Sequence, residues 1–194
     1  MLDTDGEKLR SGIGRLPAQV QAHIEEVRVA SVALARTWKL DVDKAELAAL
    51  AHDVCRVTPA KDLLRMAVDY GLPITAIDRS FPVFLHGPVG AEVLRRGYRL
   101  MDDSVLDPIR YHTMGREDMT ALDKVLFLAD KLDPSKVSRY PFIGEVARIA
   151  HEDLDRAMLL FIDNQVKAFI DHGDLVHPGM IAARNSAVLA TKGR

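Results

Sequence analysis

Apolar residues recur every three or four positions over much of the chain, which is the spacing of one face of an α-helix. The first such run extends from Leu16 to Trp38 and predicts a long helix with one face turned to a core. His23 lies at the edge of that face. Residues 1–15 carry scattered glycine and charge without this period. We therefore expect a loosely ordered start and a folded domain over residues 16–194.

A second helix is predicted around residues 45–51, which are almost all alanine and leucine. Asp43 and Glu46 have the spacing of a capping box, so we expect this helix to begin at Asp43. His52 and Asp53 follow directly, in surroundings where an unpaired polar group is destabilising. A metal ion would satisfy both side chains. Hydrogen bonds to nearby backbone are the alternative.

Further helices are predicted from the same period and from start and stop signals. They cover about 59–70, 88–96, 103–111, 121–130, 142–149 and 154–170, with a last helix from Pro178. Residues 75–88 are expected to be irregular, and Pro108 to kink its helix or delay its start. Alternating strand patterns are rare. The sequence therefore predicts one all-α domain, a helical bundle of about eight or nine helices.

The composition argues against several classes of protein. Hydrophobic residues make up 48% of the 194 residues, as in ordinary globular domains, and the net charge of -2 argues against a generally basic nucleic-acid binder. The single cysteine, Cys55, excludes an internal disulfide and is typical of a reducing cytosol. No apolar run approaches the roughly 20 residues that span a bilayer. We expect a cytoplasmic protein without nucleic-acid or membrane partners.

Four histidines and two aspartates share one setting, since each lies on an apolar helix face or at a helix end. They are His23, His52, Asp53, His86, His112 and Asp130. Taken singly, a histidine in such a place is more often a hydrogen-bonded core residue than a metal ligand. The joint pattern, spread over five helical segments, is less easily explained in that way.

Six short strings carry a resemblance to a known family. They are LAHD at 50–53, LHGPVGA at 85–91, IRYHTMGR at 109–116, VLFLAD at 125–130, DLDRA at 153–157, and HP at 177–178 with ARN at 183–185. In this order they resemble the HD superfamily of metal-dependent phosphohydrolases. More narrowly, they resemble the bacterial YqeK-type family of symmetrical bis(5'-nucleosyl)-tetraphosphatases. Arg56 departs from the family, which usually has lysine at this position.

The resemblance implies two divalent metal ions. The ligands of one ion would be His23, His52, Asp53 and Asp130, and those of the second His86, His112 and the same Asp53. Two such ions clamp a phosphate and activate a water molecule. Iron is the family expectation, and imidazole and carboxylate ligands without thiolate also suit manganese or another octahedral ion.

The implied reaction is the symmetrical hydrolysis of diadenosine tetraphosphate into two ADP by a metal-activated hydroxide. The expected catalytic residues are Asp53, His86, His112 and Arg116. Arg116 is expected to clamp phosphate, because a guanidinium binds phosphate bidentately. The other expected substrate contacts are Lys131, Arg184 and Arg56. Lys124 is expected to be a solvated charge, and His177 to shape the turn before the last helix.

Three other functions stay open on the sequence. The same ligands could serve another HD-type nucleotide phosphohydrolase, or a di-iron HD-type oxygenase. A catalytically silent nucleotide-binding regulator is the third, although the complete ligand set weighs against it. The sequence leaves open the native metal, the preferred base, the cleavage register and whether the chain forms a homodimer.

Overall fold

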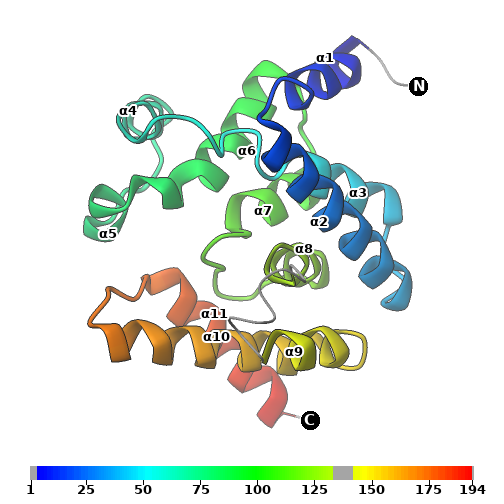
Figure 1. Cartoon of the computed structure of the whole chain (residues 1–194), viewed down its shortest axis with the longest axis vertical. Coiled ribbons are helices and arrows are strands. Elements are labelled where there is room, and N and C mark those ends of the chain that lie inside the picture. Colours follow the sequence, from blue (N-terminus) through cyan, green and yellow to red (C-terminus); the bar gives the residue numbers. More distant parts are fainter. Residues whose placement is uncertain (1–3, 133–141, 194) are drawn as a thin grey trace.

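The computed structural model describes residues 4–132 and 142–193, which form eleven α-helices and one 3-10 turn, with no strand among them (Figure 1). The elements are α1 (Thr4–Ile13), α2 (Ala18–Thr37), α3 (Val42–Ala51), α4 (Ala60–Asp69), α5 (Ala76–Ser80), η1 (Pro82–Leu85), α6 (His86–Gly97), α7 (Asp103–Tyr111), α8 (Ala121–Lys131), α9 (Phe142–Ala150), α10 (Leu154–His172) and α11 (Pro178–Lys192). The all-α prediction is confirmed. The described residues hold slightly more helices than the eight or nine expected.

Two helices lie where irregular structure was expected. Helix α1 occupies part of the N-terminal stretch, and its Leu9 is buried in a cluster that includes residues of α3. Helix α5 is specified by local hydrogen bonds, because Thr75 and Asp78 form a capping box across its first turn. Helix α5 is too short to show an apolar period, and α1 has only two apolar side chains, Leu9 and Ile13, so the pattern missed both. The division of the chain at residue 16 stays a prediction.

Helix starts agree with the sequence in some places and differ in others. Thr120 caps α8 through a capping box with Asp123, as predicted. The expected box at Asp43 is wrong: Asp41 is the N-cap of α3, and its carboxylate accepts a hydrogen bond from the Lys44 amide. Pro108 does not delay α7, which begins at Asp103 and holds the proline buried in its interior.

Helix α8 lies between two groups of helices (Figure 1). On one side it packs against α2, α3 and α7, and on the other against α9 and α10. Its residues 125–129 are all buried, so this helix contributes to two apolar clusters at once. A third cluster joins α4, η1 and α6. Within the described chain, no helix has both the length and the apolar composition to cross a membrane.

Candidate metal centre

The six predicted ligands come together from α2, α3, α6, α7 and α8, mostly at helix ends. His23 lies within α2, His52 is the C-cap of α3 and is followed by Asp53, His86 is the first residue of α6, His112 is the C-cap of α7, and Asp130 lies in the last turn of α8. Because these ends meet at one place, residues far apart in sequence become neighbours.

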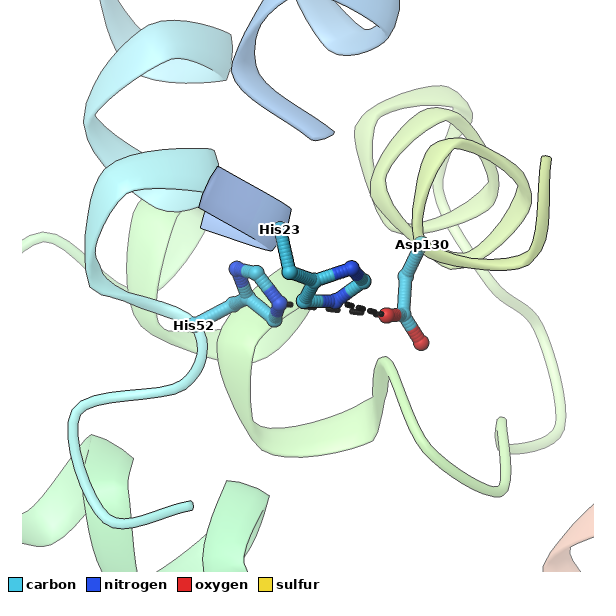
Figure 2. Close-up of side chains that lie close together, drawn as sticks. All are labelled: His23, His52 and Asp130. Carbon is cyan, nitrogen blue, oxygen red and sulfur yellow. Dashed lines mark hydrogen bonds and ion pairs between the residues drawn. The ribbon is translucent and has the colours of Figure 1, made fainter. Parts of the chain in front are cut away.

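The first set of ligands joins α2, α3 and α8. His23, His52 and Asp130 point toward one another in Figure 2. The Nε2 atom of His23 lies 2.9 Å from Asp130 Oδ1, and that of His52 lies 3.8 Å from the same oxygen. These three side chains are close enough to hold one cation between them.

The second set of ligands joins α6 and α7. The Nε2 atoms of His86 and His112 lie only 2.9 Å apart. Asp53 Oδ1 lies 3.1 Å from His86 Nε2 and 3.8 Å from His112 Nε2. Two imidazole nitrogens and one carboxylate oxygen therefore face a common point.

Asp53 lies between the two sets and presents a different oxygen to each. Its Oδ2 atom is 3.5 Å from His52 Nε2 and 3.8 Å from His23 Nε2, whereas Oδ1 faces His86 and His112. The carboxylate is buried. A bridging ligand between two cations requires this arrangement, in which each oxygen belongs to one set.

Three of the imidazoles are oriented by backbone carbonyls three residues earlier. The Nδ1 atom lies 2.7 Å from the Ala49 carbonyl oxygen for His52, 2.5 Å from that of Val83 for His86, and 2.7 Å from that of Ile109 for His112. A carbonyl can only accept, so each Nδ1–H donates and each Nε2 is left with a free lone pair. This is the tautomer that binds a metal through Nε2.

The donor set fits a cation on two further grounds. His52 Nε2 and Asp53 Oδ1 are buried and have no hydrogen-bond partner, which is destabilising unless something positive lies beside them. The facing lone pairs of His86 and His112 also repel each other without a positive charge nearby. Cations held by these nitrogens and oxygens would satisfy all of these atoms.

Electrostatics keep the ligands in their binding forms. Burial lowers the pKa of His52 and, more strongly, that of His112, so these imidazoles are neutral near pH 7. Burial alone would raise the pKa of Asp53, but any proton taken up by the surrounding imidazoles, first by His86, brings that pKa well below its ordinary value. The pKa of Asp130 is also well below its ordinary value. Burial raises this pKa, but Lys131 and the other neighbouring side chains lower it by more. Both aspartates are therefore carboxylates at neutral pH.

Gly87 lets the second set form. A Cβ atom at this position would lie 2.9 Å from the Ile109 carbonyl oxygen, 3.0 Å from that of Arg110 and 3.2 Å from His112 Cε1. Only a residue without a side chain allows α6 to approach the end of α7 this closely. The approach brings the imidazoles of His86 and His112 together.

The ligand cluster borders a cavity of about 740 Å³. Five of the six ligands line it, namely His23, Asp53, His86, His112 and Asp130, whereas His52 is fully buried behind them. Arg56 and Lys131 line the same cavity and supply positive charge. Arg56 Nε lies 3.8 Å from Asp53 Oδ2, and Lys131 Nζ lies 2.5 Å from Asp130 Oδ2. The structure therefore places two of the four predicted substrate contacts here.

Arg116 is placed differently from the sequence-based expectation. Its Nη2 atom donates to Asp123 Oδ2 at 2.8 Å and lies 3.3 Å from Asp107 Oδ2. It does not line the cavity. This position does not favour the expected phosphate clamp, because buried Asp123 at the start of α8 holds the guanidinium. The IRYHTMGR string gave no sign of this partner.

Other charged residues also have structural partners. Arg184, predicted to contact substrate, pairs with Asp163 at 2.5 Å outside the cavity. Lys124 is not a solvated charge, since its ammonium lies 2.5 Å from the buried carboxylate of Asp155. His177 is the N-cap of α11 and accepts from the Gly179 amide, as its expected role at the turn implies.

Several cavity residues were not singled out from the sequence. The Thr113 hydroxyl lies 3.2 Å from His112 Nε2 and 3.4 Å from His86 Nε2, and it donates because both nitrogens carry free lone pairs. Val83 and Phe84, from η1, form part of the wall. Their position two and three residues before His86 was the only available signal, and an irregular stretch gives no indication of which side chains face a cavity.

Comparison with known proteins identifies the family. The sequence pattern of the HD domain matches residues 20–135, which include all six ligands. The chain belongs to the HD domain family. Within this family, it is 32% identical to a symmetrical bis(5'-nucleosyl)-tetraphosphatase of Bacillus subtilis, over 84% of this chain and 86% of that protein. A Halalkalibacterium halodurans protein of the same name is 31% identical over 88% and 89% of the two chains.

A solved structure supports the assignment to the HD domain family. A crystal structure from Clostridium acetobutylicum, described as a predicted HD superfamily hydrolase involved in NAD metabolism, superposes with a TM-score of 0.88. It is 29% identical, and the match covers 95% of this chain and 97% of that one. The similarity to these HD domain proteins therefore extends over nearly the whole chain.

Proposed function

We propose that the chain is a symmetrical bis(5'-nucleosyl)-tetraphosphatase that hydrolyses diadenosine tetraphosphate to two ADP with the help of two divalent cations. One observation carries the proposal: Asp53 presents one oxygen to His23 and His52 and the other to His86 and His112. The names of the relatives from Bacillus and Halalkalibacterium support the choice of substrate.

The six ligands would divide as the resemblance implies. His23, His52 and Asp130 would hold one cation and His86 and His112 the other, with Asp53 shared. Iron is our first choice of metal and manganese the second, because the set contains nitrogen and oxygen donors and no thiolate. When bound, two such cations lower the pKa of a water molecule and offset the charge on phosphate oxygens.

The remaining side chains of the cavity would bind and orient the substrate. Arg56 is about half exposed and can turn its guanidinium to a phosphate, for which it offers paired N–H donors. Lys131 adds charge beside Asp130, and its ammonium also contacts the His112 carbonyl at 3.3 Å. The Thr113 hydroxyl is within reach of the second ligand set and can hydrogen-bond a water molecule or a phosphate oxygen there.

Hydrolysis forms one bond and breaks one. The oxygen of a water molecule bonds to one of the two central phosphorus atoms, and the bond from that phosphorus to the oxygen between them breaks. One water proton stays on the first ADP or passes to solvent, and the other neutralises the departing oxygen of the second ADP. Symmetrical cleavage requires that the middle of the tetraphosphate lie over the ligands.

Chromatography of the products tests the proposal. Protein loaded with iron or manganese should convert diadenosine tetraphosphate to ADP alone. His86→Ala should lower turnover by more than about 100-fold, since even residues that only orient metal ligands are worth 10- to 100-fold. His172→Ala, which removes an exposed imidazole at the end of α10, is the matched control and should keep full activity.

Other products would contradict the proposal. AMP with ATP would refute the symmetrical register, and hydrolysis of mononucleotides alone would indicate another HD-type nucleotide phosphohydrolase. Oxygen consumption by the iron-loaded protein without hydrolysis would indicate a di-iron oxygenase. The cytoplasmic location stays a prediction from the sequence, and whether the chain forms a homodimer stays open.

A further inference from the structure

Three of the apolar side chains that line the cavity are Val57, Val83 and Phe84, and we call these three the apolar wall. Val57 is 51% exposed and Val83 39% exposed, so both offer apolar surface to whatever fills the cavity. Val57 follows Arg56, and Phe84 lies two residues before His86. The wall and the groups expected to hold phosphate therefore line the same cavity.

The Phe84 ring contacts two other rings. The ring of Phe81 lies 5.8 Å away at an interplanar angle of 34°, and that of His177 lies 6.1 Å away, edge on at 79°. His177 is fixed in turn, because its Nδ1 accepts from the Gly179 amide at 3.0 Å and its Nε2 lies 3.4 Å from Asp78 Oδ1. The aromatic face is thus oriented before any ligand binds.

A ligand that fills the cavity must suit both its charged and its apolar lining. Anionic phosphates suit the ligand sets, Arg56 and Lys131. An apolar, planar group suits the wall. We infer that the apolar wall is a nucleobase subsite, in which one base of the dinucleotide stacks on the Phe84 ring. The inference rests on the proposed function and names the residues that bind the nucleoside.

Binding of ADP and of inorganic diphosphate separates the wall from the phosphate site. The two ligands share the phosphate chain and differ by the nucleoside. In calorimetric titrations of manganese-loaded protein, Phe84→Ala should weaken ADP binding by about 5- to 150-fold, the range of one lost base–aromatic stack. Diphosphate binding should not change. Phe84→Tyr keeps the aromatic face and should bind ADP as the unaltered chain does.

Val68→Ala is the control, because it removes a 62% exposed valine of α4 that does not line the cavity. It should leave both affinities unchanged. Equal weakening of ADP and diphosphate by Phe84→Ala would overturn the inference, since Phe84 would then support the whole cavity. Unchanged ADP binding would overturn it as well. Neither result would contradict the proposed hydrolysis. That proposal is contradicted if the metal-loaded protein does not cleave diadenosine tetraphosphate.

Discussion

Replacement of Gly87 by alanine tests how closely the fold and the ligands depend on each other. The added methyl would lie 2.9 Å from the Ile109 carbonyl oxygen and 3.0 Å from that of Arg110. Both are backbone atoms, so no side chain can turn away. The Ile109 carbonyl also accepts the hydrogen bond that orients His112. The methyl therefore presses on the atom that fixes this imidazole.

The expected effect has two parts. Ordinary contact distances begin near 3.4 Å, so α6 and α7 must separate by a few tenths of an ångström. Overpacking of this kind costs about 1–3 kcal/mol, or about 2–12 °C in melting temperature for a domain of this size. The same movement pulls His86 from His112, which are 2.9 Å apart at Nε2. We expect metal content to fall along with stability.

Gly97→Ala is the matched control, because a Cβ at this position at the end of the same helix would meet nothing within 4 Å. Melting curves of the metal-free proteins measure the strain, and elemental analysis after reconstitution measures the metal per chain. Gly97→Ala should be neutral or slightly stabilising and should keep its metal. If Gly87→Ala behaves in the same way as Gly97→Ala, the close approach of the two helices does not shape the site.

Three further predictions concern the partner of Arg116, the buried imidazoles and the buried cysteine. Arg116→Ala should destabilise the protein by about 1–3 kcal/mol in urea unfolding, because buried Asp123 loses its guanidinium, and the KM for the dinucleotide should stay the same. The metal-free protein should lose stability below about pH 6.5, since the lowered pKa values of His52 and His112 mean that the unfolded chain takes up protons first. Burial raises the pKa of the Cys55 thiol to about 11, so Ellman's reagent should react with it only after unfolding.

Each of these outcomes has a control and a contrary result. Arg184→Ala removes an arginine from a largely exposed ion pair and should cost less than about 1 kcal/mol; an equal loss in both variants would contradict the role of Asp123. Equal urea midpoints at pH 7.5 and 5.5 would show that the two imidazoles are not buried as described. Rapid labelling of Cys55 in the native protein, at the rate found in urea, would contradict its 5% exposure.

Several of the candidate ligands leave a local sign in the sequence, and the structure brings all six together. His52 and Asp53 follow an apolar run that must be buried, and Asp130 ends a helix whose start Thr120 marks. Helix α10, with Gly173 in the left-handed conformation at its end, was equally clear. Apolar period and capping chemistry act within a few residues, so one sequence is enough to read them.

The partners of charged side chains are harder to predict, because contacts across the fold decide them. Arg116 looked free to bind phosphate, yet the loop before α8, which has no apolar period, folds so that Arg116 pairs with Asp123. Phe84 lies in a short 3-10 turn without a period, so its exposure to the cavity could not be predicted. Helix α1 was missed because its stability depends on contacts such as the burial of Leu9.

The central claim is that six side chains hold two cations with Asp53 between them, and the metal content per chain tests it most directly. Elemental analysis of the protein reconstituted with iron or manganese should give two ions per chain. Asp53→Ala should fall below one ion per chain, because it removes a ligand from both sets. Two ions retained by Asp53→Ala, or no stoichiometric metal in the unaltered protein, would contradict the account.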